Sequence, residues 1–218
     1  MIHCALAMTR EKRSLLRHAS WGCLLLGVVL GCSIKQPAPI KQTFLLEASR
    51  RTPPHNPGGV GSLQVRPVQV AAPFAGRGFV YRRSDWNYEA DFYHEFLVPP
   101  RSLMEEQVRR WFSASRLFVP VLEPSSKGDI AFSLETTVTA ICGDARDPGH
   151  PKASLGLQFA LTDERVRPGA LILQRAYRRD IPTQGRGPES LAAGWSQGLS
   201  EILAELEQDI NGRVAERR

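Results

Sequence analysis

Three consecutive runs of alternating apolar and polar residues constrain the fold of this chain more than any other feature. They lie at Asp129–Ile141, Ala153–Leu161 and Leu171–Ile181. Successive side chains of a strand point to opposite faces, so each run indicates a strand with one buried face. The connections are short and contain turn residues such as Arg167-Pro168-Gly169, which predicts an antiparallel meander. The expected inward positions of the first run are Ile130, Phe132, Leu134, Thr136, Val138 and Ala140.

A helix is predicted over residues 102–115, before the meander. Ser102 precedes Glu105 by three residues, which matches a capping box at the start of a helix. The apolar residues that follow are spaced to form one helical face. A ligand-binding surface could show the same stripe, but packing against a core is the more common use of such a face. The stripe consists of Met104, Val108, Trp111 and Phe112.

A second, longer helix is predicted after the meander. Gly187-Pro188-Glu189 opens it, with proline in the first turn, where its missing N–H is not needed. An apolar face of this length needs a sheet to cover. The expected fold class is α+β: a single domain with a mostly antiparallel or mixed sheet covered by two amphipathic helices. The apolar stripe of this helix consists of Leu191, Trp195, Leu199, Ile202, Leu203, Leu206 and Ile210.

Shorter strands are predicted upstream of the first helix. One candidate is Thr43–Glu47, and another is Leu63–Val70, which Pro67 interrupts. Because proline cannot donate to a ladder, the second candidate is expected at a sheet edge or in a bulge. Gly78–Arg82 and Ala90–Val98 flank a turn-like segment, so they predict a hairpin.

The N-terminus has the pattern of a lipoprotein export signal. A basic segment, residues 10–18, precedes the uncharged run Trp21–Leu30, which is too short for the ~20 residues that span a bilayer. Val29-Leu30-Gly31-Cys32 follows the order of a lipobox, which predicts cleavage between Gly31 and Cys32 and lipidation of Cys32. An ordinary secretory signal with an incidental cysteine is the alternative. The predicted organisation is a signal peptide (1–31), a lipidated flexible tether (32–42), the domain (43–212) and a disordered tail (213–218).

This processing changes what the composition implies. The full chain has 28 basic and 22 acidic residues, and a charge of +6 would favour nucleic-acid binding. Removal of residues 1–31 leaves 187 residues and a charge of +3, so no nucleic-acid partner is predicted. The mature chain keeps Cys32 and Cys142, which excludes an internal disulfide if Cys32 is lipidated. The residue after the lipidated cysteine acts as a sorting signal, and an aspartate there would favour retention at the inner membrane. This chain has Ser33, which predicts the periplasmic face of the outer membrane of a Gram-negative bacterium.

Several short motifs suggest chemistry that their context does not support. Ser196 lies at the centre of a G-x-S-x-G motif, but the motif falls inside the helical stripe and no histidine follows it, which disfavours a hydrolase. Cys142 and Asp144, with Asp147 and His150, could suggest a metal site or a Cys–His pair, yet a solvated loop is the preferred interpretation.

The remaining polar residues indicate no chemistry of their own. His55 and His94 are expected to be surface or hydrogen-bonded polar residues, and the pairs Arg82-Arg83 and Arg178-Arg179 to be solvated strand ends. We therefore predict no catalytic residue, no metal and no cofactor, and expect that the protein is not an enzyme.

In this order along the chain, the features resemble the ABC-type transport auxiliary lipoprotein family, whose PqiC-like members are auxiliary components of MCE-type lipid transport systems. The resemblance spans Lys41–Ile210. At Tyr93–Phe96 the family often has a tryptophan, and this chain does not. The matching segments are Phe44-Leu45-Leu46, Leu63–Val68, Phe79-Val80-Tyr81-Arg82, Tyr88–Phe96, Pro99-Pro100, Asp129–Leu134 and the last amphipathic helix.

The resemblance implies a docking or tethering subunit that is held at the outer membrane through lipidated Cys32. Its implied partners are an MCE-domain protein with its permease and ATPase, while phospholipid binding and homo-oligomerisation stay open. The alternative is a structural or assembly lipoprotein of the outer membrane that binds protein partners alone.

Overall fold

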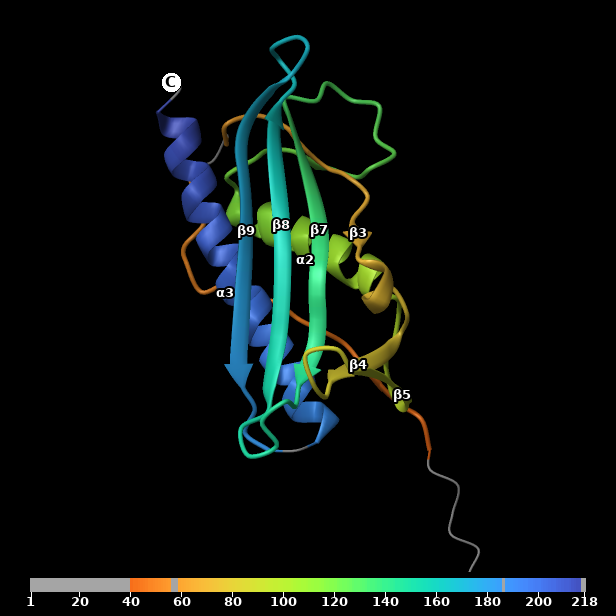
Figure 1. The fold of residues 1–218 in the computed structure, drawn as a ribbon. Helices are drawn as coiled ribbons and strands as arrows, with labels where there is room; N and C mark the ends of the chain where they lie inside the picture. Colours follow the sequence, from red (N-terminus) through yellow and green to blue (C-terminus); the bar gives the residue numbers. More distant parts are fainter. Residues whose placement is uncertain (1–39, 56–58, 186, 217–218) are drawn as a thin grey trace, which may run out of the picture. The chain divides into compact units, whose positions relative to one another are not determined.

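One long strand, β7 (Phe132–Asp144), joins two parts of a mixed sheet (Figure 1). Along one edge it pairs antiparallel with β8 (Lys152–Asp163), which pairs in turn with β9 (Ala170–Pro182). This is the predicted meander. Along the other edge of β7, three short strands follow one another, each parallel to it. They are β2 (Leu63–Val65), β3 (Gln69–Val70) and β4 (Gly78–Arg82).

The structure is a computed structural model that describes residues 40–55, 59–185 and 187–216. The predicted signal peptide and the lipidation site, with Gly31 and Cys32, lie outside the described residues. The α+β fold class is confirmed, with a curled mixed sheet and two helices. No helix of the described residues combines the length and the apolar character needed to cross a membrane.

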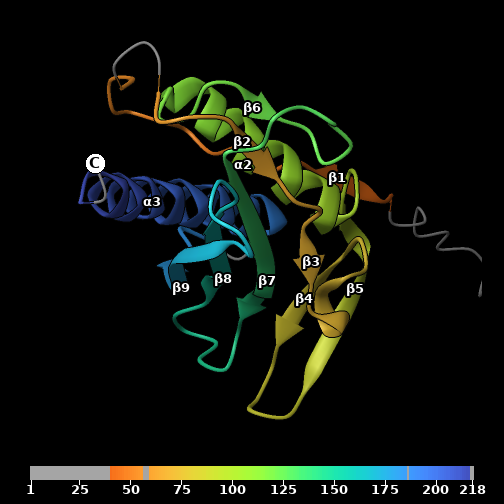
Figure 2. The same cartoon turned by 90° about the horizontal axis from the view of Figure 1, so that it is seen from above.

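The remaining strands complete the part of the sheet before the meander. β5 (Tyr88–Phe96) pairs antiparallel with β4 and forms the predicted hairpin, and β1 (Gln42–Phe44) lies parallel to β5. Figure 2 shows this hairpin extending away from the helices. β6 (Val121–Leu122) pairs with β2 on the side away from β7.

The edge position predicted for the Leu63–Val70 strand holds for its second part, because β3 pairs with β7 alone among the described strands. β2 lies between β6 and β7, and all three of its residues are buried. Pro67 falls in the gap between β2 and β3, so its missing N–H interrupts no ladder hydrogen bond. The strand is therefore divided into two short pieces, of which β3 lies at an edge and β2 does not.

Both α-helices lie behind the sheet in the view of Figure 1, α2 (Pro100–Ser115) and α3 (Pro188–Ala215). A single-turn 3-10 helix, η1 (Ala72–Phe74), connects β3 to β4. The predicted capping box is wrong: α2 begins at Pro100, and among the described residues no side chain caps its start. Proline at the first helical position has a suitable φ and no N–H to satisfy, so the helix starts before Ser102. α3 reaches Ala215, three residues into the predicted tail.

The apolar stripes of both helices are buried against the sheet, as predicted. At the centre, the ring of Phe79 lies 4.8 Å from that of Trp195 in an edge-to-face contact and 4.7 Å from that of Phe96. These aromatic contacts connect β4, β5 and α3 across the layers. The core therefore extends under the end of the sheet where β4 meets β7.

Candidate functional site

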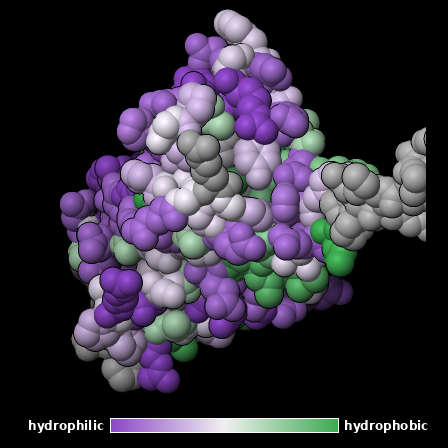
Figure 3. Space-filling model, turned by 90° about the horizontal axis from the view of Figure 1, so that it is seen from below, coloured by the Kyte–Doolittle hydropathy of each residue, from purple (hydrophilic) through white to green (hydrophobic). Residues whose placement is uncertain are grey.

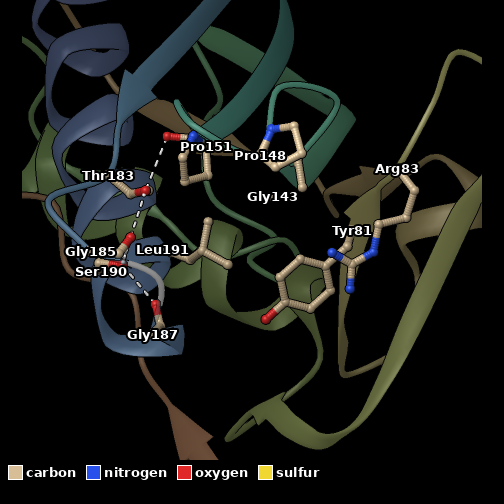
Figure 4. A pocket seen from close by; sticks show the side chains of 11 residues that line it. Tyr81, Arg83, Gly143, Pro148, Pro151, Thr183, Gly185, Gly187, Ser190 and Leu191 are labelled. Carbon is tan, nitrogen blue, oxygen red and sulfur yellow. Dashed lines mark hydrogen bonds between the residues drawn. The ribbon is translucent and has the colours of Figure 1, made fainter.

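A cleft of about 430 Å³ opens where β4 and β7 end and α3 begins. Its volume lies in the range of small-ligand sites, ~300–1,000 Å³. Figure 4 shows the ring of Tyr81 and the side chain of Leu191 facing each other in it. The two prolines of the β7–β8 connection, Pro148 and Pro151, add further apolar surface. The cleft thus joins three segments that lie far apart in the sequence.

Gly143 holds the base of the cleft open. It pairs in register with Tyr81 across β7 and β4. A Cβ atom at position 143 would lie 3.1 Å from the side chains of both Tyr81 and Leu191. That separation is tighter than ordinary van der Waals contact, so the absence of a side chain lets the tyrosine ring lie over the strand.

The hydroxyl groups at the loop side of the cleft are already engaged. The Oγ1 atom of Thr183 lies 3.0 Å from the carbonyl oxygens of Pro151 and Gly185, and Ser190 Oγ donates to the Gly187 carbonyl at 2.7 Å. These bonds fix the loop that leads into α3. The cleft therefore presents a mainly apolar surface to a ligand.

Tyr81 and Arg83 provide the polar rim of the cleft. The Arg83 guanidinium lies over the Tyr81 ring, 4.9 Å from its centroid, and its Nε donates to Glu89 at 2.8 Å. Burial raises the pKa of Tyr81 to about 12, and the nearby Asp91 carboxylate adds to the shift. The hydroxyl is therefore protonated at neutral pH, with the Asp91 carboxylate as its hydrogen-bond acceptor.

None of the described residues that line the cleft is a cysteine, histidine, aspartate or glutamate. The serine and threonine hydroxyls that do line it bond to backbone carbonyls. The arrangement instead suits a group with apolar surface, such as a hydrocarbon chain or a hydrophobic side chain.

The residues of the suspected metal or Cys–His site are engaged separately. Cys142 is a free buried thiol, and burial raises its pKa to about 11. Hydrogen bonds from Arg146, at 3.0 Å through Nε and 2.8 Å through Nη2, hold the pKa of Asp144 below its usual range. Asp147 accepts from the His150 ring at 2.9 Å on the exposed loop. Across the described part of the chain, no three such side chains converge as metal ligands.

Ser196 lies within α3, as predicted, and the glycines of its motif have a packing role. A Cβ at Gly194 would lie 2.6 Å from the Cβ of Ala153 on β8, which means that the helix approaches the strand closely there. The Ser196 hydroxyl accepts a hydrogen bond from the Glu47 amide at 3.2 Å. The strand-to-helix turn of a nucleophile elbow is not formed in this segment.

The two histidines and the two arginine pairs noted in the sequence each lie beside an acidic side chain. His94 lies 2.7 Å from Asp91, and His55 lies 2.8 Å from Glu207. The four arginines of the two basic pairs each contact an acidic side chain: Arg82 with Asp85, Arg83 with Glu89, Arg178 with Asp180, and Arg179 with Glu201 and Glu205.

Glu207 was not identified from the sequence as a buried carboxylate. Glu207 is 5% exposed and accepts from Arg50 at 2.6 Å and from the Trp111 indole at 2.8 Å. Burial by itself would raise its pKa, but the hydrogen bonds from Arg50 and His55 outweigh burial and hold the pKa below its usual range. The signal was a charged residue inside an apolar stripe, directly after Leu206.

No family model matches the chain, and no curated protein matches it significantly. Among solved structures, a DUF330 protein from Xanthomonas campestris superposes with a TM-score of 0.65 at 17% identity, covering 80% of this chain and 99% of its own. The structure of an uncharacterised protein superposes with a TM-score of 0.64 at 20% identity. The match covers 78% of this chain and 99% of that protein. The chain therefore shares the fold of a DUF330 protein over nearly the whole length of that protein.

Proposed function

We propose that this chain is an outer-membrane-anchored periplasmic lipoprotein, without catalytic activity, that docks or tethers an MCE-type ABC intermembrane lipid transport system. The carrying observation is that the segments resembling the transport auxiliary family fall, in chain order, on helices and strands of one fold. Phe44 lies in β1, Leu63–Val65 form β2, and Phe79–Arg82 lie in β4. The following acidic-aromatic segment is β5, and the closing amphipathic helix is α3.

The proposed attachment runs through Cys32. A diacylglycerol on this thiol, with a further acyl chain on the new amine, gives stable anchoring, because two or more chains bind a bilayer far more firmly than one. The chain from Cys32 then joins the domain at β1, where Lys41 lies 3.5 Å from Glu95 of β5.

The cleft is the proposed receiving site for an apolar group of the transport system, a phospholipid acyl chain or a partner side chain. Its free surface consists largely of the Tyr81 ring, Leu191 and prolines. Energy would come from the ATPase of the system, since this role requires binding and no covalent step.

The test is crosslinking and co-purification of the full-length lipidated protein from cells that also express an MCE protein. Recovery of the MCE protein, its permease or phospholipid supports the proposal. Recovery of outer-membrane assembly proteins without any of these would favour a structural lipoprotein instead. Cys32→Ala should release the protein as a soluble or precursor form.

A serine-reactive probe tests the enzymatic alternative in the same preparation. No labelling is expected, because the Ser196 hydroxyl contacts the Glu47 backbone amide and the cavity that it lines contains no histidine among its described residues. Labelling that disappears in Ser196→Ala would contradict the non-enzymatic proposal.

A further inference from the structure

Exposed apolar side chains gather at one end of the molecule. Among the described residues, eleven large hydrophobic side chains are exposed, and eight of them lie within residues 40–45 and 86–98. Six belong to β1, β5 and their immediate flanks, and we call this group the apolar edge. The apolar edge consists of Ile40, Leu45, Phe92, Tyr93, Leu97 and Val98.

The pairing of β1 with β5 explains why Leu45 and Leu97 face outward. The two strands are parallel, with Phe44 in register with Phe96, which is 2% exposed and faces the core. Leu45 and Leu97 directly follow the two strands, and the Leu97 amide still donates to the Phe44 carbonyl at 2.9 Å. Because side chains alternate along extended chain, both point to the opposite side. They are 50% and 47% exposed. Figure 3 shows hydrophobic residues gathered on this face, next to the start of the described chain.

Two cationic side chains lie beside the aromatic residues of the apolar edge. The ammonium group of Lys41 lies 4.7 Å from the centroid of the Phe92 ring, and the Phe92 and Tyr93 rings contact edge to face at 5.2 Å. Lys41 and Arg77 both pair with Glu95, at 3.5 and 2.9 Å. Aromatic rings and long basic side chains beside aliphatic groups are typical of surfaces that lie in a lipid interface.

The length of the predicted tether favours a lipid surface as the occupant of the apolar edge. Cys32 precedes Ile40 by eight residues, which span at most ~26 Å when fully extended. As a flexible chain they span about 16 Å on average. A lipidated Cys32 would thus keep the apolar edge, which begins at Ile40, within a short distance of the bilayer.

We propose that the apolar edge rests on the membrane that holds the anchor, with Leu45, Leu97 and Phe92 entering the headgroup region. The inference depends on the proposed lipidation of Cys32. It adds an orientation: β1 and β5 face the bilayer, and the β8–β9 connection points away from it. Figure 1 shows that connection at the far end of the sheet from β5.

Tryptophan quenching tests this orientation directly. In the described residues Trp86 is 95% exposed, whereas Trp111 and Trp195 are buried. Trp86→Phe with Leu97→Trp therefore places the one exposed indole of the mature chain in the apolar edge. The lipidated variant is reconstituted into vesicles of phosphatidylethanolamine and phosphatidylglycerol that contain brominated phosphatidylcholine. The expected result is a blue-shifted emission that the brominated lipid quenches.

The matched control places the indole at the other end of the sheet, by Trp86→Phe with Val166→Trp, since Val166 is 52% exposed on the β8–β9 connection. Its emission should be unaffected by the brominated lipid. Equal quenching of the two variants, or no quenching at position 97 in protein that floats with the vesicles, would overturn the proposed orientation. Failure of the lipidated protein to float would overturn the anchoring as well.

A second measurement separates a lipid surface from a second copy of the chain. Leu45→Ser with Leu97→Ser should reduce the vesicle-dependent protection of β1 and β5 in hydrogen exchange and leave the thermal unfolding midpoint unchanged, because both side chains are exposed. Protection of the same strands by self-association without vesicles, lost in this variant, would show that the apolar edge is an interface between copies and would overturn the proposal.

Discussion

The indole of Trp111 donates a 2.8 Å hydrogen bond to the carboxylate of Glu207 and so connects α2 to α3. The same carboxylate accepts from Arg50, whose side chain is 9% exposed, and lies 2.8 Å from the ring of His55. Both residues belong to the segment that leads from β1 toward β2. One buried acid therefore holds together the two helices and the entry segment of the domain.

Glu207→Gln should destabilise the domain by about 3 kcal/mol, because it leaves the nearly buried Arg50 guanidinium without its counter-charge. The measurement is urea unfolding followed by circular dichroism. Glu201→Gln is the matched control on the same helix: Glu201 pairs with Arg179 but is 42% exposed, so a loss of about 0.5 kcal/mol is expected. Equal losses for the two variants would contradict the assigned role.

The stability of the domain should fall in acid, in part through Glu207. Its pKa in the folded state is below the ordinary value of 4.5. The ionised form therefore contributes stability that is fully present above pH 4.5 and is lost as the pH falls through the lower folded-state pKa. Urea midpoints measured from pH 7 down to pH 3 should drop less steeply in Glu207→Gln than in the parent. An unchanged slope would show that other carboxylates, such as Asp144, carry the acid sensitivity.

Gly143→Ala should narrow the cleft, because the added methyl group meets Tyr81 and Leu191 at 3.1 Å. The expected results are weaker binding of an apolar fluorescent probe and a loss of about 1–2 kcal/mol from overpacking. Gly76→Ala is the control, since a Cβ there would meet no atom of the described residues within 4 Å. Unchanged probe binding in Gly143→Ala would mean that the probe does not use the cleft.

Gly194→Ala should be more destabilising than its place in a helix suggests. Alanine normally stabilises a helix by about 1 kcal/mol relative to glycine. At position 194 its methyl group would lie 2.6 Å from the Ala153 side chain, so α3 must move away from β8, with an expected net loss of about 2 kcal/mol. Gly212→Ala, where a Cβ would meet no described atom within 4 Å, should be neutral or stabilising. Thermal unfolding of both variants tests this packing role, and equal midpoints would contradict it.

Cys142 should resist alkylation in the native protein. Its thiol is 3% exposed and its pKa is raised to about 11, so little thiolate exists at pH 8. In a Cys32→Ala background, mass spectrometry should find slow labelling by iodoacetamide in buffer and rapid labelling in urea. Val166→Cys provides an exposed thiol as the positive control. Rapid native labelling of Cys142 would mean that the end of β7 opens readily.

The meander was predictable because each of its strands carries a long alternating pattern. One detail within it was not: the register of β7 against β8 shifts between Val138 and Ala140, so the alternation expected to place Ala140 inward is broken there. Opposite the shift is Gly156, where a Cβ would lie 2.6 Å from the Thr139 hydroxyl. A bulge of one residue leaves almost no trace in a hydrophobic pattern.

The parallel strands beside β7 could not be derived from the sequence in the same way. β2, β3 and β4 contain two to five residues each, and their register depends on partners more than sixty residues away. The cleft and the contacts of Glu207 could not be derived from the sequence for the same reason. Both arise where segments distant in the sequence meet, so the individual residues show their roles only after the fold is assembled.

The parallel pairing of β1 with β5 has a mechanical consequence for a tethered protein. A pull on the chain ahead of Gln42 acts along β1, and β5 is held on its other edge by β4. The hydrogen bonds between β1 and β5 then resist shear together instead of opening one after another. After β1 in the sequence, Leu46 is buried in the core and Arg50 forms an ion pair with Glu207. These contacts connect the segment after β1 to α3. In a domain anchored through Cys32 as proposed, tension on the anchor would therefore load the β1–β5 pair in shear.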